Sequence, residues 1–171
     1  RLVRQKGFDM LLQALAGCAG EWSLDIVGDG PERANLESLA RDLGLSARVR
    51  FVGRVDDPWL QYGAASLFVL SSRYEGFPNV LLEAMANGLT VVSFDCESGP
   101  SEIVRNEIDG LLVPPDDIVA MSRAIDKVMT NAILRASLAR RAIEVADRFS
   151  VANVTAMWDD LVNQLSSRRD A

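Results

Sequence analysis

Short, nearly apolar runs alternate with helix-like segments along most of this chain, and this alternation restricts its fold more than any other feature. The runs Leu67–Leu70 and Thr90–Phe94 have no alternating polar face, so both sides of each strand are expected to be covered. Elsewhere apolar residues recur at the spacing of an amphipathic helix, as Phe8, Leu11, Leu12 and Leu15 do. Strands of this kind, each followed by a helix, predict a parallel sheet with helices on both faces. We therefore expect an α/β fold, a Rossmann-like doubly wound sheet of about six strands with extra C-terminal helices.

The 171 residues suit a single domain, and no linker or low-complexity segment divides them. The last six residues, 166–171, are expected to form a disordered tail. The first residue is Arg1 rather than Met, and the stretch Arg1–Val3 resembles the end of a strand. We therefore expect the chain to be a fragment of a longer protein.

The net charge of −6 argues against nucleic acid as a partner, because binding a phosphate backbone needs a dense surface of Lys and Arg. The chain has no histidine, which excludes a Ser-His-Asp triad, a histidine-ligated zinc and a histidine general base. Neither a metal site nor a cofactor is expected. The two cysteines, Cys18 and Cys96, are expected to be free thiols in a reducing compartment, with a disulfide or a metal pair as the less favoured alternative.

No apolar run reaches the roughly 18 residues of a membrane span, and no signal peptide is visible. We therefore expect a soluble protein of the cytoplasm. The arginine pairs Arg140-Arg141 and Arg168-Arg169 are expected to be solvated. A peripheral contact of these pairs with anionic lipid, on the inner face of the membrane, stays open as an alternative.

Doubly wound sheets bind ligands at the carboxyl ends of their strands, so the loops after the strands are where a site is expected. The loop Ser71–Asn79 is the most informative of them. Gly76 allows backbone to approach a ligand closely, and the proline two residues later suits the first turn of a helix. The N–H groups of Asn79, Val80 and Leu81 would then point out of the helix N-terminus, which favours a phosphate.

Two glutamates accompany this turn, Glu75 in the loop and Glu83 about one turn into the helix. An ionised carboxylate can accept hydrogen bonds from both hydroxyls of a vicinal diol, of which a ribose has one and a hexose several. Together with a phosphate at the helix end, this pattern favours a nucleotide-sugar ligand. The residues alone leave open that Glu83 is an ordinary solvated helix residue. The turn Gly28–Pro31 lacks the third glycine of a dinucleotide fingerprint and is interpreted as an ordinary strand–helix turn.

The stretch EGFPNVLLEAMANGLTVV resembles the signature of the retaining glycosyltransferases of family 4, in which seven residues separate two glutamates. The segments RLVRQKGFDMLLQAL, LDIVGDGPER, VRFVGRVDD, GPSEIV, GLLVPPDD and FSVANVTAMWDDL are similar to that family in the same order. The resemblance therefore covers nearly the whole chain. It implies the C-terminal, donor-binding half of a two-domain GT-B architecture, with the N-terminal half that binds the acceptor absent from this sequence.

The resemblance also implies roles for individual residues. Arg1 and Lys6 would hold the donor diphosphate and stabilise it as it leaves. Glu83 would bind the ribose hydroxyls, and Glu75 would contact hydroxyls of the transferred sugar. Backbone N–H groups of Gly76, Phe77 and Asn79 would assist Glu75, those of Val80 and Leu81 would meet a phosphate, and Arg54 and Val55 would lie against the base.

The implied activity is metal-independent transfer of a sugar with retention at the anomeric carbon, from a nucleoside-diphosphate sugar, with a UDP-sugar favoured. The implied acceptor is a polysaccharide, lipid-linked or other glycan bound by the missing half, so the chain alone is expected to be inactive. One alternative is a nucleotide-sugar epimerase of the same architecture, although its proton transfers need extra carboxylates and histidines. Another is a non-catalytic nucleotide-sugar-binding module. In the family the last helix, here around Val151–Leu165, crosses onto the N-terminal half; in this chain it either packs locally or leaves an apolar patch exposed.

Overall fold

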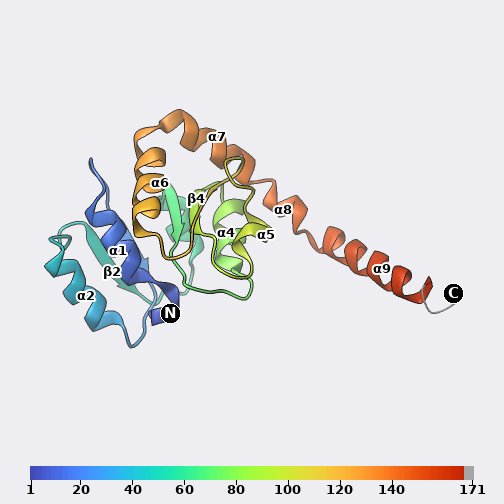
Figure 1. Ribbon diagram of the computed structural model, residues 1–171, viewed down its shortest axis with the longest axis horizontal. Helices are drawn as coiled ribbons and strands as arrows, with labels where there is room; N and C mark the ends of the chain where they lie inside the picture. Colours follow the sequence, from blue (N-terminus) through green and yellow to red (C-terminus); the bar gives the residue numbers. More distant parts are fainter. Residues whose placement is uncertain (168–171) are drawn as a thin grey trace.

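The computed structural model of the chain describes residues 1–167, and within them strands and helices alternate as the sequence predicts (Figure 1). The strands are β1 (Leu24–Val27), β2 (Val49–Gly53), β3 (Leu67–Leu70), β4 (Thr90–Phe94) and β5 (Leu111–Val113). The helices up to the last strand are the 3-10 helix η1 (Arg4–Lys6), α1 (Phe8–Ala16), α2 (Arg33–Asp42), α3 (Trp59–Ala64), α4 (Asn79–Ala86) and α5 (Pro100–Ile103). The helices after it are α6 (Ile118–Thr130), α7 (Ala132–Ala142), α8 (Val145–Arg148) and α9 (Val151–Ser167).

The strands within residues 1–167 form two parallel groups, the pair β1–β2 and the three-stranded sheet β3–β4–β5. Parallel strands joined by helices confirm the Rossmann-like α/β fold. The structure has five strands in this range rather than about six, because the stretch Arg1–Val3 is not part of a sheet. The Leu2 N–H donates to the carbonyl of Asp29, and the Leu2 carbonyl accepts from the N–H of Glu32. Leu2 therefore binds the turn after β1 instead of a neighbouring strand.

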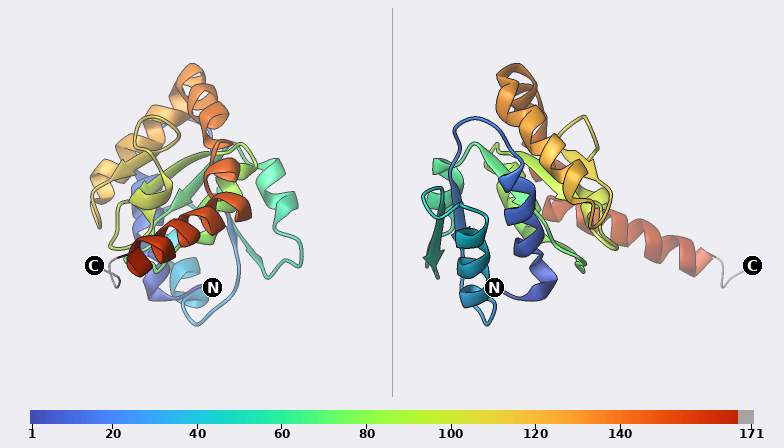
Figure 2. Two further views of the ribbon diagram at one scale, coloured as in Figure 1. Left: turned by 90° about the vertical axis from the view of Figure 1, so that its right-hand side faces the viewer. Right: turned by 60° about the vertical axis from the view of Figure 1, so that its left-hand side comes forward.

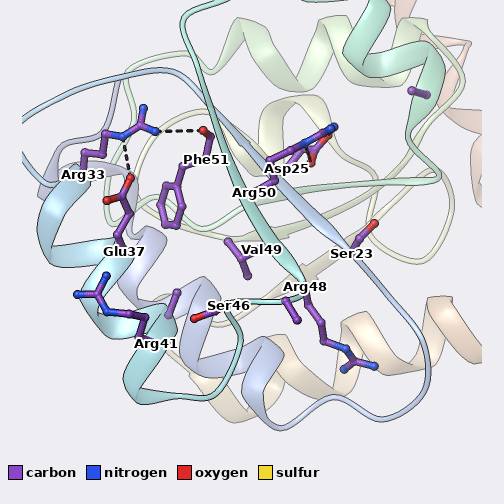
Figure 3. A pocket seen from close by; sticks show the side chains of 13 residues that line it. Ser23, Asp25, Arg33, Glu37, Arg41, Ser46, Arg48, Val49, Arg50 and Phe51 are labelled. Carbon is purple, nitrogen blue, oxygen red and sulfur yellow. Dashed lines mark hydrogen bonds and ion pairs between the residues drawn. The ribbon is translucent and has the colours of Figure 1, made fainter.

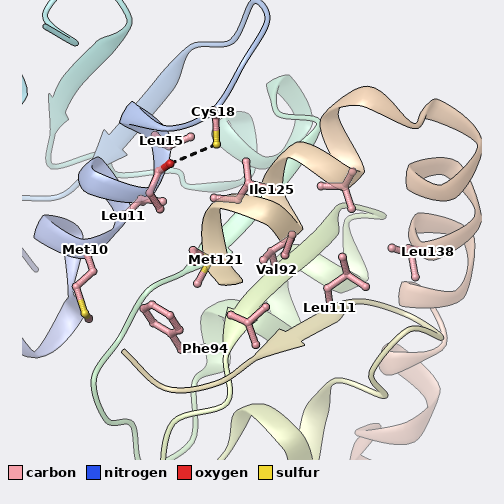
Figure 4. Packing of buried hydrophobic residues seen from close by; sticks show 14 residues of the cluster. Met10, Leu11, Leu15, Cys18, Val92, Phe94, Leu111, Met121, Ile125 and Leu138 are labelled. Carbon is pink, nitrogen blue, oxygen red and sulfur yellow. Dashed lines mark hydrogen bonds between the residues drawn. The ribbon is translucent and has the colours of Figure 1, made fainter. Parts of the chain in front are cut away.

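Helices cover both faces of the three-stranded sheet, as the apolar strands predict. In Figure 1, β4 lies between α6 on one side and α4 on the other, and every residue of β4 is buried. Leu11 of α1 packs with Met121 of α6 and Phe94 of β4 on the first face (Figure 4). Leu81 and Met85 of α4 belong to the cluster on the second face. The sheet is thus the rigid scaffold on which the loops at its carboxyl edge are mounted.

Both cysteines are buried free thiols, as expected. Cys18 belongs to the apolar cluster of Figure 4, where its thiol lies 3.4 Å from the carbonyl of Ala14. Burial raises the pKa of Cys18 and of Cys96. Because the thiolate is the reactive form, both side chains are structural rather than nucleophilic.

The segment Arg1–Gly7 runs across the carboxyl ends of β1 and β3, and two glycines permit this path. Gly7 has φ +62°, and a Cβ added to it would lie 1.9 Å from the carbonyl oxygen of Ser71. A Cβ added to Gly30 would lie 2.3 Å from the carbonyl oxygen of Leu2. The absence of a side chain at Gly30 therefore allows the segment Arg1–Gly7 to pack against the turn after β1. The interpretation of this turn as an ordinary strand–helix turn did not predict that contact.

Helix α9 projects away from the rest of the structure and packs mainly against α8 (Figures 1 and 2). Apart from that contact, it leaves an apolar patch exposed, the second of the two expected alternatives; the exposed residues are Val151, Met157, Trp158, Leu161, Val162 and Leu165. Residues 166 and 167 of the expected disordered tail belong to α9, and residues 168–171 lie outside the described residues. Within residues 1–167, no helix has both the length and the apolar character needed to cross a membrane.

Candidate functional site

The centre of the candidate site is an ion pair between residues 69 positions apart. The Nζ of Lys6 lies 2.7 Å from Oε1 of Glu75, and the hydroxyl of Ser72 donates to the same oxygen at 2.6 Å. The side chain of Glu75 is 7% exposed and that of Lys6 is 29% exposed. Within residues 1–167 the hydrogen bonds of this carboxylate go to Oε1, so Oε2 is left for a ligand.

The loop after β3 is tied to the segment before α1, which explains why Lys6 and Glu75 meet. The hydroxyl of Ser71 donates to the carbonyl of Lys6 at 2.9 Å, and the Arg73 N–H donates to the carbonyl of Gln5 at 2.8 Å. The Arg73 guanidinium also forms a bidentate pair with Asp9, with N–O distances of 2.9 and 2.6 Å. The hydrogen bond from Arg73 lowers the pKa of Asp9. The ion pair is therefore held on a preorganised backbone.

Two of the cations that the sequence identifies, Arg1 and Arg54, lie on segments that meet at the turn after β1. A Cβ added to Gly28 would lie 3.4 Å from the backbone nitrogen of Arg1. The Gly28 N–H donates to the carbonyl of Gly53, directly before Arg54. Arg54 follows β2, and Val55 beside it is half-buried. Neither the Arg1 nor the Arg54 guanidinium has an ion pair within residues 1–167. Uncompensated positive charge beside a carboxylate with one free oxygen can bind a phosphate together with a hydroxyl group.

The second glutamate, Glu83, has a partner that the sequence analysis missed. Its Oε2 accepts a hydrogen bond of 2.9 Å from the hydroxyl of Tyr62 in α3. Burial, and then the hydrogen bond to Glu83, raises the pKa of Tyr62, so the phenol remains a donor at neutral pH. Glu83 is therefore not an ordinary solvated helix residue. No motif or periodicity in the sequence indicates that Tyr62 contacts Glu83, which lies 21 positions later.

The start of α4 offers fewer free N–H groups than the sequence predicts. The Asn79 N–H donates to the carbonyl of Phe77 at 3.0 Å, and the Leu81 N–H donates to the carbonyl three residues before it at 2.8 Å. The N–H groups of Val80, Phe77 and Gly76 make no hydrogen bond within residues 1–167. An anion at this turn would therefore meet these three groups, while those of Asn79 and Leu81 are already used in the tight turn that precedes the helix.

The surface also has two hollows, of which the smaller adjoins the helix that contains Lys6. The larger, of about 920 Å³, lies over β2 and α2, and its lining includes the ion pairs of Arg33 with Glu37 and of Arg50 with Asp25 (Figure 3). The smaller, of about 220 Å³, lies beside η1 and α1. Neither is lined by Glu75 or Glu83. We place the candidate site at the glutamates in spite of the larger hollow, because they lie in the loop and helix that follow β3, where a nearly buried ion pair leaves a carboxylate oxygen free.

The model of the family described as Glycosyl transferases group 1 matches residues 1–145. The lipopolysaccharide core biosynthesis glycosyltransferase LpsE of Rhizobium meliloti is 42% identical over 95% of this chain and 47% of its own length. An exopolysaccharide phosphotransferase of Streptomyces coelicolor is 39% identical over 99% of this chain and 18% of its own length. The crystal structure of HepE from Anabaena in complex with UDP has a TM-score of 0.85 and 29% identity, covering 98% of this chain and 47% of that one. The chain thus spans less than half the length of each of these proteins.

Proposed function

The chain belongs to the glycosyl transferases group 1 family, and we propose that it is the donor-binding half of a GT-B glycosyltransferase. The observation that carries the proposal is the ion pair of Lys6 with the nearly buried Glu75, with Arg1 on the same segment as Lys6 and Arg54 beside the turn that receives that segment. This arrangement puts cations for a diphosphate next to a carboxylate for sugar hydroxyls. That HepE was crystallised with UDP supports a nucleotide as a ligand of this fold and favours a UDP-sugar as donor.

The donor contacts follow from the free groups of the site. We assign the diphosphate to Arg1 and Lys6, with help from the N–H groups of Gly76, Phe77 and Val80. Oε2 of Glu75 then accepts from hydroxyls of the transferred sugar, and Oε1 of Glu83 accepts from the ribose. Arg54 and Val55 flank the base. Asn79 and Leu81 contribute through the shape of the turn, because their N–H groups are already bonded.

The reaction we propose is transfer with retention at the anomeric carbon, as in family 4. The bond between the anomeric carbon and the donor phosphate oxygen breaks, and its electron pair stays on the diphosphate. An acceptor hydroxyl oxygen bonds to the anomeric carbon, and its proton passes to the leaving phosphate. Negative charge therefore develops on the diphosphate, where preorganised cations stabilise the transition state. Neither a histidine base nor a metal ion is required for this scheme.

We assign acceptor binding to a domain outside this sequence. The chain spans 47% of the length of LpsE, which leaves room for a second domain in a protein of that size. Because LpsE is a glycosyltransferase of lipopolysaccharide core biosynthesis, a glycan or lipid-linked acceptor is the class that we propose. The projecting α9 supports a second domain, because its exposed apolar side chains need a cover in a longer protein. A cytoplasmic location remains our proposal for the whole enzyme, with peripheral contact to the inner face of the membrane as the alternative.

The test is calorimetric titration of the full-length enzyme with UDP, GDP and ADP, with and without Mg²⁺. Selective binding of UDP at the same affinity in both conditions is the expected result, and absence of binding by all three diphosphates would overturn the donor role. A product assay with a nucleotide-sugar donor and a glycan acceptor then separates the candidates. Transfer to the acceptor supports the proposal, an epimerised donor indicates an epimerase, and binding without either product indicates a binding module.

A further inference from the structure

Tyr62 lies near the site but has no role in the donor contacts assigned above. It belongs to α3, which follows the loop that bears Arg54 and Val55, and its hydroxyl lies 2.9 Å from Oε2 of Glu83. The hydroxyl is the donor in this pair, because an ionised carboxylate can only accept. One oxygen of Glu83 is thus already held by the protein.

Packing fixes the ring of Tyr62 before any ligand arrives. The ring makes edge contacts with Trp59, at 6.0 Å between centroids, and with Phe68 of β3, at 6.1 Å. Tyr62 and Phe68 both pack against the buried cluster that includes Leu81 and Met85 of α4. Because Glu83 belongs to α4 as well, the donor and the acceptor of this hydrogen bond are mounted on the same core.

The hydrogen bond restricts a side chain that would otherwise be flexible. A glutamate has three rotatable side-chain bonds, and fixing them when a ligand binds lowers affinity through lost entropy. Within residues 1–167, the hydrogen bond that the Glu83 carboxylate accepts comes from Tyr62 and goes to Oε2. This bond restricts the side chain before a ligand binds, so less entropy is lost on binding, and it leaves Oε1 to accept from a ligand.

We propose that Tyr62 is a positioning residue, which holds Glu83 so that Oε1 faces the vicinal hydroxyls of a ribose. This inference rests on the proposed function, because it requires that Glu83 binds the nucleotide. A tyrosine with a purely structural role would make the same contact, but removing its hydroxyl would change the affinity for a ligand equally whether or not that ligand carries the ribose hydroxyls. The two roles are therefore separated by comparing ligands with and without these hydroxyls.

The experiment compares UDP with 2′,3′-dideoxy-UDP as ligands of the full-length enzyme, measured by calorimetry. Tyr62→Phe keeps the packed ring and removes only the hydroxyl. We expect it to weaken UDP binding by about tenfold and to leave binding of the dideoxy analogue unchanged, because preorganisation of Glu83 matters only when the diol is present. The chain offers a matched control, since its other tyrosine, Tyr74, is 58% exposed; Tyr74→Phe should change neither affinity.

A double-mutant cycle with Glu83→Ala checks that Tyr62 acts through this carboxylate. In the Glu83→Ala background, Tyr62→Phe should have no further effect on UDP affinity, and an unchanged melting temperature would show that the fold is intact. If Tyr62→Phe weakens the binding of both ligands equally, or leaves the affinity for UDP unchanged, the positioning role of Tyr62 is overturned, while the role of Glu83 in binding the nucleotide stands. Equal affinity of the unmodified enzyme for UDP and its dideoxy analogue shows instead that no ribose contact exists, which overturns the assignment of Glu83 and this inference with it.

Discussion

The ammonium of Lys6 lies 2.7 Å from the carboxylate of Glu75, although the two residues are 69 positions apart in the sequence. The pair joins the segment before α1 to the loop after β3, and Ser72 donates to the same carboxylate oxygen. Because the Glu75 side chain is 7% exposed, its charge depends on these two donors for compensation. Under the proposed function, the same contact serves both the stability of the loop and the binding of a donor.

Replacement of Lys6 by methionine should affect both properties. We expect Lys6→Met to lower the free energy of unfolding by about 1–3 kcal/mol, because it leaves a mostly buried carboxylate without its cation. We expect kcat/KM to fall by about 100-fold or more, because a cation that stabilises the leaving diphosphate is lost. Urea denaturation and steady-state kinetics measure the two effects. The double variant Lys6→Met/Glu75→Gln should regain part of the stability but none of the activity; a full return of activity would contradict the diphosphate role.

Removal of the Glu83 carboxylate should weaken nucleotide binding. A hydrogen bond to a charged group contributes roughly 1.5–3 kcal/mol, so Glu83→Ala is expected to raise the Kd for UDP by about one to two orders of magnitude. Calorimetric titration measures this change. The control is Glu37→Ala, which removes a helix glutamate whose partner is Arg33, away from the site. Unchanged affinity in Glu83→Ala would refute the ribose role.

Gly7 should tolerate no side chain. A Cβ at this position would lie 1.9 Å from the Ser71 carbonyl oxygen, so Gly7→Ala must displace the segment that carries Lys6. We expect a loss of more than about 3 kcal/mol in the free energy of unfolding, together with loss of nucleotide binding. Gly20 is the matched control, because it also has positive φ (+78°) but nothing within 4 Å of an added Cβ. Gly20→Ala should lower stability by roughly 1–2 kcal/mol and leave binding intact. Similar losses for both variants would show that the close approach at Gly7 does not matter.

The Arg73–Asp9 pair should give a pH-dependent contribution to stability. The hydrogen bond from Arg73 lowers the pKa of Asp9 in the folded protein, so the contribution is present above the ordinary aspartate pKa of about 3.9 and is lost as the pH falls through the lower folded value. Because both side chains are partly exposed, its size should be at most about 1 kcal/mol. The difference in unfolding free energy between the unmodified protein and Arg73→Met should therefore be constant from pH 8 to 5 and shrink below pH 4. A difference that persists after Asp9 is protonated would point to packing by Arg73 as its source.

The sequence allowed the architecture to be predicted because its signal is local. The apolar runs at Leu67–Leu70 and Thr90–Phe94 became β3 and β4, buried between helices as expected. The stretch Arg1–Val3 looked like the end of a strand, but whether such residues pair in a sheet depends on distant partners. Here the backbone of Leu2 bonds to the turn after β1, and no periodicity within three residues could have indicated that.

The candidate site was predicted residue by residue from the resemblance, and the structure adds which side chains meet. Glu75 was expected in the loop after a strand, and Lys6 was expected to hold the donor diphosphate, yet their ion pair depends on how two loops cross. The partner of Glu83 was not predicted, because Tyr62 lies in a short helix and carries no charge or motif. The free N–H groups at α4 were overestimated, because a tight turn at Asn79 uses donors that an isolated helix end would leave free.

The segment Arg1–Gly7 is also hydrogen-bonded to both strand groups. The amide of Leu2 is bonded to the turn after β1, and the amide of Arg73, after β3, is bonded to Gln5 of the same segment. If the segment detaches, both amides become open to exchange with solvent in one event. A diphosphate held by Lys6 would oppose this detachment, so occupancy of the site should slow hydrogen exchange at the amides of Leu2 and Arg73 together. The strand groups β1–β2 and β3–β4–β5 would then open as one cooperative unit.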